Sequence, residues 1–155
     1  MALGLAGCAT GATGEAGKFV EEHGRGASDV ASATHALEQA AAGLPASLNP
    51  ARLGQLTSAA VRTRRAAEEA SEWDASGESA EAALEEEDLP RAEAQVTSAA
   101  GELVRAVVAI QAYTRARSAG RLTRYRNKLG AAREQWDDGI AEIWRLAKRS
   151  DPPTL

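Results

Sequence analysis

Apolar residues recur at heptad spacing in four stretches of the chain, which is the pattern of one buried face on an α-helix. In the first stretch, residues 16–43, two such lines are Val20, Ala27, Thr34 and Ala41, and His23, Val30, Leu37 and Leu44. Gly24 and Gly26 interrupt the pattern and Ser28 can cap a fresh start, so we expect the regular helix to begin near Ser28. Gly43, followed closely by a proline, predicts its end.

The second stretch begins at Asn49, a good N-cap residue, with Pro50 at the first helical position. It runs to about Asp74, and its apolar line is Leu53, Leu56, Ala60, Thr63, Ala67 and Ala70. These small residues bury little area, so we expect this helix to be one of the weaker contributors to the core. Residues 74–88 are rich in serine, glycine and acids and predict a connector with about two helical turns.

The third and fourth stretches carry the clearest helical patterns. The third opens at Asp88-Leu89-Pro90, and its two lines are Val96, Leu103 and Ile110, and Ala92, Ala99, Ala106 and Tyr113. The fourth, expected to end at Ser150 before two prolines, has the lines Leu122, Leu129, Trp136 and Ile143, and Tyr125, Ala132, Gly139 and Leu146. Between residues 89–117 and 121–149 we favour a hairpin at Ser118-Ala119-Gly120, because one helix of about 90 Å could bury little of its apolar face in a monomer.

These patterns predict an all-α fold, an up-down bundle of three to four Ala-rich helices after a flexible N-terminal tether. We assign residues 1–17 to a signal remnant and tether, residues 18–150 to the bundle and residues 151–155 to a C-terminal tail. Alanine supplies 36 of the 155 residues, whereas Leu, Ile, Val and Phe together number only 25, a share found in disordered chains. The net charge of only -4 and the many strong helix formers favour a folded helical chain.

The composition excludes several classes of protein. One cysteine and two histidines rule out a disulfide scaffold and a zinc module, and no apolar run approaches the length of about 18 residues that a membrane-spanning helix needs. His23 and His35 lack ligand partners at helical spacing, so we expect no metal site. There is no glycine-rich phosphate loop and no nucleophile with a nearby base, so we expect no cofactor and no enzymatic activity.

The single cysteine lies in the tetrapeptide Leu5-Ala6-Gly7-Cys8, an aliphatic residue and two small residues before a thiol. This tetrapeptide resembles the lipobox of bacterial lipoproteins, in which the thiol accepts a diacylglycerol group. The resemblance implies that lipidated Cys8 anchors the chain to the cell membrane on its extracytoplasmic side, and the small residues 9–14 suit a tether. A secretory signal needs more than the seven residues before Cys8, so we expect the true start upstream; the alternative is a free thiol in a cytosolic terminus.

Charge is segregated along the chain. Residues 68–93 hold eleven acids and one cation, whereas residues 103–133 hold eight cations and no acid. Four of these cations are predicted to share one helical face: Arg117, Arg121, Arg124 and Lys128. Three interpretations stay open: a solvated face that partly pairs with the acidic connector, a surface for anionic lipid headgroups or wall polymer, and a nucleic-acid site interleaved with Tyr113 and Tyr125. The negative net charge and the lipobox argue against nucleic acid.

The three tryptophans have different positions in the pattern. Trp136 lies on a heptad line and is expected in the core, Trp73 lies at a polar helix end, and Trp144 fits the core and an exposed partner anchor equally well.

Taken together, the sequence predicts a membrane-tethered extracytoplasmic helical lipoprotein that acts as a non-catalytic binding or scaffolding module. Its expected partners are the membrane, through Cys8, and an envelope protein or anionic polymer, with no nucleic acid favoured. The alternative is a cytosolic helical regulatory or nucleic-acid-associated protein that uses the basic stretch 105–133.

Overall fold

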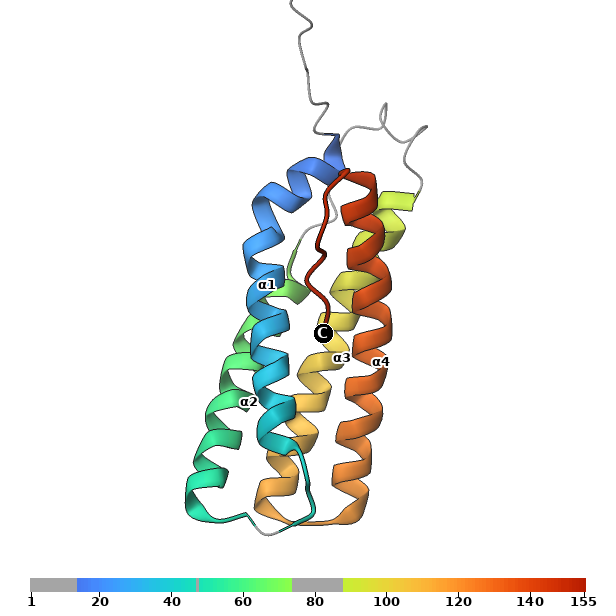
Figure 1. The fold of residues 1–155 in the computed structure, drawn as a ribbon. Helices are drawn as coiled ribbons and strands as arrows, with labels where there is room; N and C mark the ends of the chain where they lie inside the picture. Colours follow the sequence, from blue (N-terminus) through green and yellow to red (C-terminus); the bar gives the residue numbers. More distant parts are fainter. Residues whose placement is uncertain (1–13, 47, 74–87) are drawn as a thin grey trace, which may run out of the picture.

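Four antiparallel helices form an elongated bundle in a computed structural model that describes residues 14–46, 48–73 and 88–155. They are α1 (Glu15–Ala41), α2 (Pro50–Ser71), α3 (Asp88–Arg115) and α4 (Ala119–Leu146). The helices run alternately down and up in chain order (Figure 1). The prediction of an all-α up-down bundle is confirmed, whereas the predicted tether before residue 14 and the predicted connector 74–87 lie outside the described residues.

The two hairpin turns lie where the sequence predicts them, and side-chain caps mark the helices that follow them. The side chain of Asn49 accepts a hydrogen bond from the Arg52 N–H at 2.8 Å, which caps α2, and Gly43 has a φ of 77° after the end of α1. Ser118 caps α4 by accepting from the Arg121 N–H at 3.3 Å. The hairpin between α3 and α4 is therefore confirmed, and the single long helix is excluded.

The predicted start of the first helix is wrong, because α1 begins at Glu15 and continues through both glycines. Ser28 caps nothing; its hydroxyl donates to the Gly24 carbonyl oxygen at 3.1 Å within the helix. A Cβ atom on Gly26 would lie 2.7 Å from Cζ2 of Trp73, so glycine makes room there for an aromatic ring of the neighbouring segment. In the interior of a helix, glycine is about 1 kcal/mol less favourable than alanine. Packing of the Trp73 ring against Gly26 offsets this cost.

Two helices end earlier than the sequence predicts. The second ends at Ser71 instead of Asp74, and α4 ends at Leu146 instead of Ser150. After α4 the chain forms a Schellman motif, in which Lys148 has a φ of 53° and the Arg149 N–H donates to the Trp144 carbonyl oxygen at 2.9 Å. A lysine in this left-handed conformation gives no sequence signal of the kind that glycine would, so the apolar pattern alone overestimates the length of α4.

The core lies along the bundle axis, where the predicted apolar faces meet. Its largest fully buried side chains include Trp136, Leu37, Leu56, Leu103, Ile110, Ile140 and Ile143. The second helix contributes mainly alanines, as predicted, and also the fully buried Thr63, whose hydroxyl lies 2.9 Å from the Ala59 oxygen and 2.8 Å from the Ala33 oxygen of α1. Small side chains thus bring the two backbones close enough for one threonine hydroxyl to join them.

An aromatic cluster joins α1, the end of α2 and α4. The ring of His23 stacks on Trp73 with centroids 4.8 Å apart, and Phe19 meets both rings edge-on. The ring of Trp73 also lies 6.1 Å from that of Trp136, which is fully buried, so the predicted core position of Trp136 is confirmed. Trp144 is only 6% exposed and belongs to the core as well.

The pKa of His23 makes folding sensitive to pH. Burial lowers this pKa below its usual value of 6.5, and the nearby Glu22 carboxylate opposes the effect only in part. The unfolded chain therefore binds the proton more readily, so the stability contribution of neutral His23 is complete above pH 6.5 and is lost as the pH falls through the lowered folded-state pKa.

When the pH is lowered from about 7.5 to about 5.5, we expect the free energy of unfolding to fall less for His23→Gln than for the parent protein. Urea unfolding at the two pH values measures this difference. The control is His35→Gln, because the His35 side chain is 53% exposed and outside the aromatic cluster. Equal pH dependence in the His23 variant and the parent would contradict the prediction.

The C-terminal residues 151–155 lie in the seam between α1 and α4 (Figure 1). The indole Nε1 of Trp136 donates to the Pro153 carbonyl oxygen at 2.9 Å. The N–H of Leu155 donates to Asp137 Oδ1 at 2.8 Å, and the Leu155 residue is only 5% exposed. The tail is therefore part of the folded unit, a contact that the two prolines in the sequence do not reveal.

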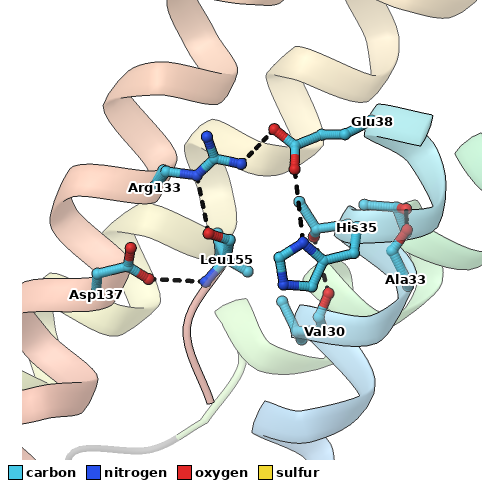
Figure 2. A network of polar contacts seen from close by, with 9 residues as sticks. Val30, Ala33, His35, Glu38, Arg133, Asp137 and Leu155 are labelled. Carbon is cyan, nitrogen blue, oxygen red and sulfur yellow. Dashed lines mark hydrogen bonds and ion pairs between the residues drawn. The ribbon is translucent and has the colours of Figure 1, made fainter. Parts of the chain in front are cut away.

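Arg133 connects this tail to both flanking helices (Figure 2). Its Nε donates to the Leu155 carbonyl oxygen at 2.8 Å, and its Nη2 pairs with the Glu38 carboxylate of α1. The other Glu38 oxygen lies 3.7 Å from Nδ1 of His35. These contacts link α4 to α1 and to the C-terminal residues.

Candidate functional site

A groove between α3 and α4 combines apolar and cationic side chains, and we refer to it as the α3–α4 groove. Its volume is about 460 Å³, within the range of small-molecule sites. The third helix lines it with Val104, Arg105, Val108, Ala109 and Ala112, and the fourth with Arg121, Arg124 and Lys128. The apolar lining of the groove therefore comes from α3, which also contributes Arg105, and the other three cations come from α4.

Helical spacing places these residues opposite one another. Val104, Val108 and Ala112 are four residues apart and form a strip along α3. The cations of α4 follow the spacing of three and four residues that keeps side chains on one helical face. Because the turn at Ser118 makes α3 and α4 antiparallel neighbours, the strip and the cations face a common groove.

The cations of the groove differ in what they contact within the protein. Arg121 donates through Nη1 to the carbonyl oxygens of Ala112 and Ala116, at 3.1 and 3.0 Å, near the end of α3. The Ala112 oxygen also accepts from the Ala116 N–H at 3.1 Å, and the Ala116 oxygen, just beyond the end of α3, also accepts from the Ser118 N–H at 2.8 Å. Arg124 is exposed and makes no hydrogen bond or ion pair with any residue of the described ranges.

Glu102 provides the negative charge next to the groove. Its carboxylate lies 2.8 Å from Nζ of Lys128 and also pairs with Arg105. The hydrogen bond from Lys128, assisted by Arg105, lowers the pKa of Glu102 below its usual value even though partial burial opposes the shift. One carboxylate thus faces two cations, and with Arg121 and Arg124 the groove has four positive charges against one negative charge.

The structure brings together three of the four cations that the sequence assigned to one face. Arg121, Arg124 and Lys128 line the groove, whereas Arg117 does not; its Nη2 lies 3.5 Å from the Leu48 carbonyl oxygen near the start of α2. Arg126 similarly donates to the Leu44 oxygen at 2.6 Å. Much of the basic stretch therefore binds backbone carbonyls of the protein itself, and the acidic connector that we considered as its partner lies outside the described residues.

The contribution of α3 to this groove was not predicted from the sequence. Val108 is 49% exposed, and in the described part of the chain Val61 of α2 is the other large apolar side chain with high exposure. A signal was present, because Val104 and Val108 lie beside the heptad lines of α3 and not on them. An apolar residue that lies outside the buried heptad lines of its helix is a candidate for a surface contact.

A second groove, between α1 and α2, has a volume of about 570 Å³ but a different chemistry. Its polar lining side chains are Gln39, Gln55, Ser58 and Arg62. With one cation and two neutral amides, it lacks the combination of apolar strip and excess positive charge that the α3–α4 groove has.

Comparisons with known proteins add no family to this description. The chain has no match among protein-family models, curated proteins or solved structures. Within the described ranges, no group of three or more His, Cys, Asp or Glu side chains is arranged to hold a metal ion, and no helix is long and apolar enough to cross a membrane. Cys8 lies outside the described residues. The class that the fold defines is therefore a four-helix all-α bundle.

Proposed function

We propose that the protein is a lipid-anchored, extracytoplasmic binding module of a bacterial envelope. The observation that carries the anchor is the tetrapeptide Leu5-Ala6-Gly7-Cys8, which precedes a run of small residues and contains the single thiol of the chain. Two acyl chains on such a thiol give stable attachment, so the helical domain needs no membrane-binding face of its own.

The binding role is supported by the α3–α4 groove. Its excess positive charge suits an anionic partner, and Arg124, one of its lining residues, is exposed. Charged groups of this kind on a surface attract an anionic layer or polymer, with about 1 kcal/mol for each cation near the surface. We propose that the module binds or scaffolds such a partner and acts without catalysis.

The anchor is tested by detergent phase partitioning of protein expressed with its natural upstream sequence. We expect the parent to enter the detergent phase and Cys8→Ala to remain in the aqueous phase, because the variant has no thiol to accept the diacylglycerol group. The matched control is Thr10→Ala, which leaves the tetrapeptide intact and is expected to partition like the parent. Equal partitioning of the parent and Cys8→Ala would reject the anchor and favour the cytosolic alternative.

A further inference from the structure

We propose that the α3–α4 groove binds a single fatty acid. The alkyl chain lies along Val104, Val108 and Ala112, and the carboxylate lies beside Arg124. This inference rests on the binding role proposed above and is independent of the lipid at Cys8.

The apolar side of the groove has the shape that one alkyl chain needs. Val104 and Ala112 are eight residues apart, which corresponds to a strip about 12 Å long on one side of α3. Val108 lies in the middle of this strip and is 49% exposed, so an alkyl chain that covers it removes apolar surface from water. The volume of about 460 Å³ accommodates a ligand of this class.

The cationic side of the groove suits a carboxylate. Arg124 has no partner in the described part of the chain, so its guanidinium can bind both carboxylate oxygens at once. Arg121 already donates from Nη1, but a guanidinium has five N–H donors, so others are left for a ligand. Glu102 pairs with Lys128 and Arg105 and does not approach Arg124 closely enough to form an ion pair.

A fatty acid fits the groove better than a partner helix. A helix docks through several apolar anchors at helical spacing, and a stable protein interface buries about 1,000 Å² or more. In the described ranges the strongly exposed large apolar side chains are Val108 and Val61, and these lie on different helices, α3 and α2. The strip is therefore wide enough for one alkyl chain and too sparse for a helix.

The test is isothermal titration calorimetry with sodium dodecanoate below its micelle concentration. We expect binding at one site, no measurable binding of hexanoate, whose chain is too short to cover the strip, and none of dodecyltrimethylammonium, whose charge is repelled. Val108→Ser should weaken dodecanoate binding about tenfold through the loss of two covered methyl groups. Arg124→Gln should weaken it about fivefold.

The matched controls are Val61→Ser and Arg65→Gln, which change an equally exposed valine and an exposed arginine on α2. We expect both to bind dodecanoate like the parent, and the helical circular dichroism of all four variants to be unchanged, since the substituted side chains are exposed. Absence of dodecanoate binding, equal binding of hexanoate, or equal weakening by the control substitutions would overturn the proposal. Binding of anionic vesicles without binding of monomeric dodecanoate would overturn it too, yet would leave the Cys8 anchor and the anionic partner standing.

Discussion

Replacement of Trp136 by alanine is expected to lower the free energy of unfolding by about 3–5 kcal/mol. This side chain is fully buried, lies 6.1 Å from the ring of Trp73 and donates to the Pro153 carbonyl oxygen. The substitution removes the largest fully buried side chain of the described residues and one hydrogen bond of the tail. The free energy of unfolding of native proteins is about 5–15 kcal/mol, so the expected loss is a large part of the total.

Urea unfolding followed by circular dichroism at about 222 nm measures this change without relying on tryptophan fluorescence. Trp136→Phe separates the two contributions, because phenylalanine retains most of the apolar volume but cannot donate to the Pro153 oxygen. We expect this variant to lose about 1–2 kcal/mol. A loss below about 1 kcal/mol for Trp136→Ala would show that the core does not depend on this ring.

Two glycines of α4 are expected to respond to alanine with opposite signs. A Cβ atom on Gly139 would lie 2.9 Å from the Ala92 carbonyl oxygen and 2.9 Å from Cγ2 of Val96, so α3 would have to move. We expect Gly139→Ala to destabilise the protein by about 1–3 kcal/mol, despite the better helix propensity of alanine.

The matched control is Gly130→Ala in the same helix. Nothing lies within 4 Å of a Cβ atom at Gly130, so only the helix propensity changes, and we expect a gain of about 0.5–1 kcal/mol. Thermal or urea unfolding of both variants gives the comparison directly. If Gly139→Ala were as stable as Gly130→Ala, the close approach of α3 and α4 at Gly139 would be refuted.

Local signals in the sequence predict most of the fold. The heptad lines place all four helices, and the caps at Asn49 and Ser118 act within a few residues of their own position, so they can be read without tertiary information. The path of α1 through Gly26 could not be predicted in this way, because the ring that fills the space belongs to Trp73. From the sequence alone, a glycine within a helical pattern predicts a break. The prediction changes only when the side chain that fills the space of the missing Cβ atom is known.

The candidate site was predictable only on the side of α4. Helical spacing alone puts Arg121, Arg124 and Lys128 on one face. The valines opposite them depend on the register between α3 and α4, which heptad lines do not determine. The contact from Arg117 to Leu48 spans 69 residues along the chain, and the spacing that grouped Arg117 with the other three cations carries no information about such a contact.

The buried position of Leu155 has a practical consequence for work with the purified protein. Its N–H and carbonyl oxygen are both engaged, by Asp137 and Arg133, and its residue is almost fully covered. An affinity tag or fluorescent fusion joined after Leu155 would have to leave from this occupied seam and would compete with the native contacts. Stability comparisons among variants are therefore best made on protein to which no tag is joined at Leu155.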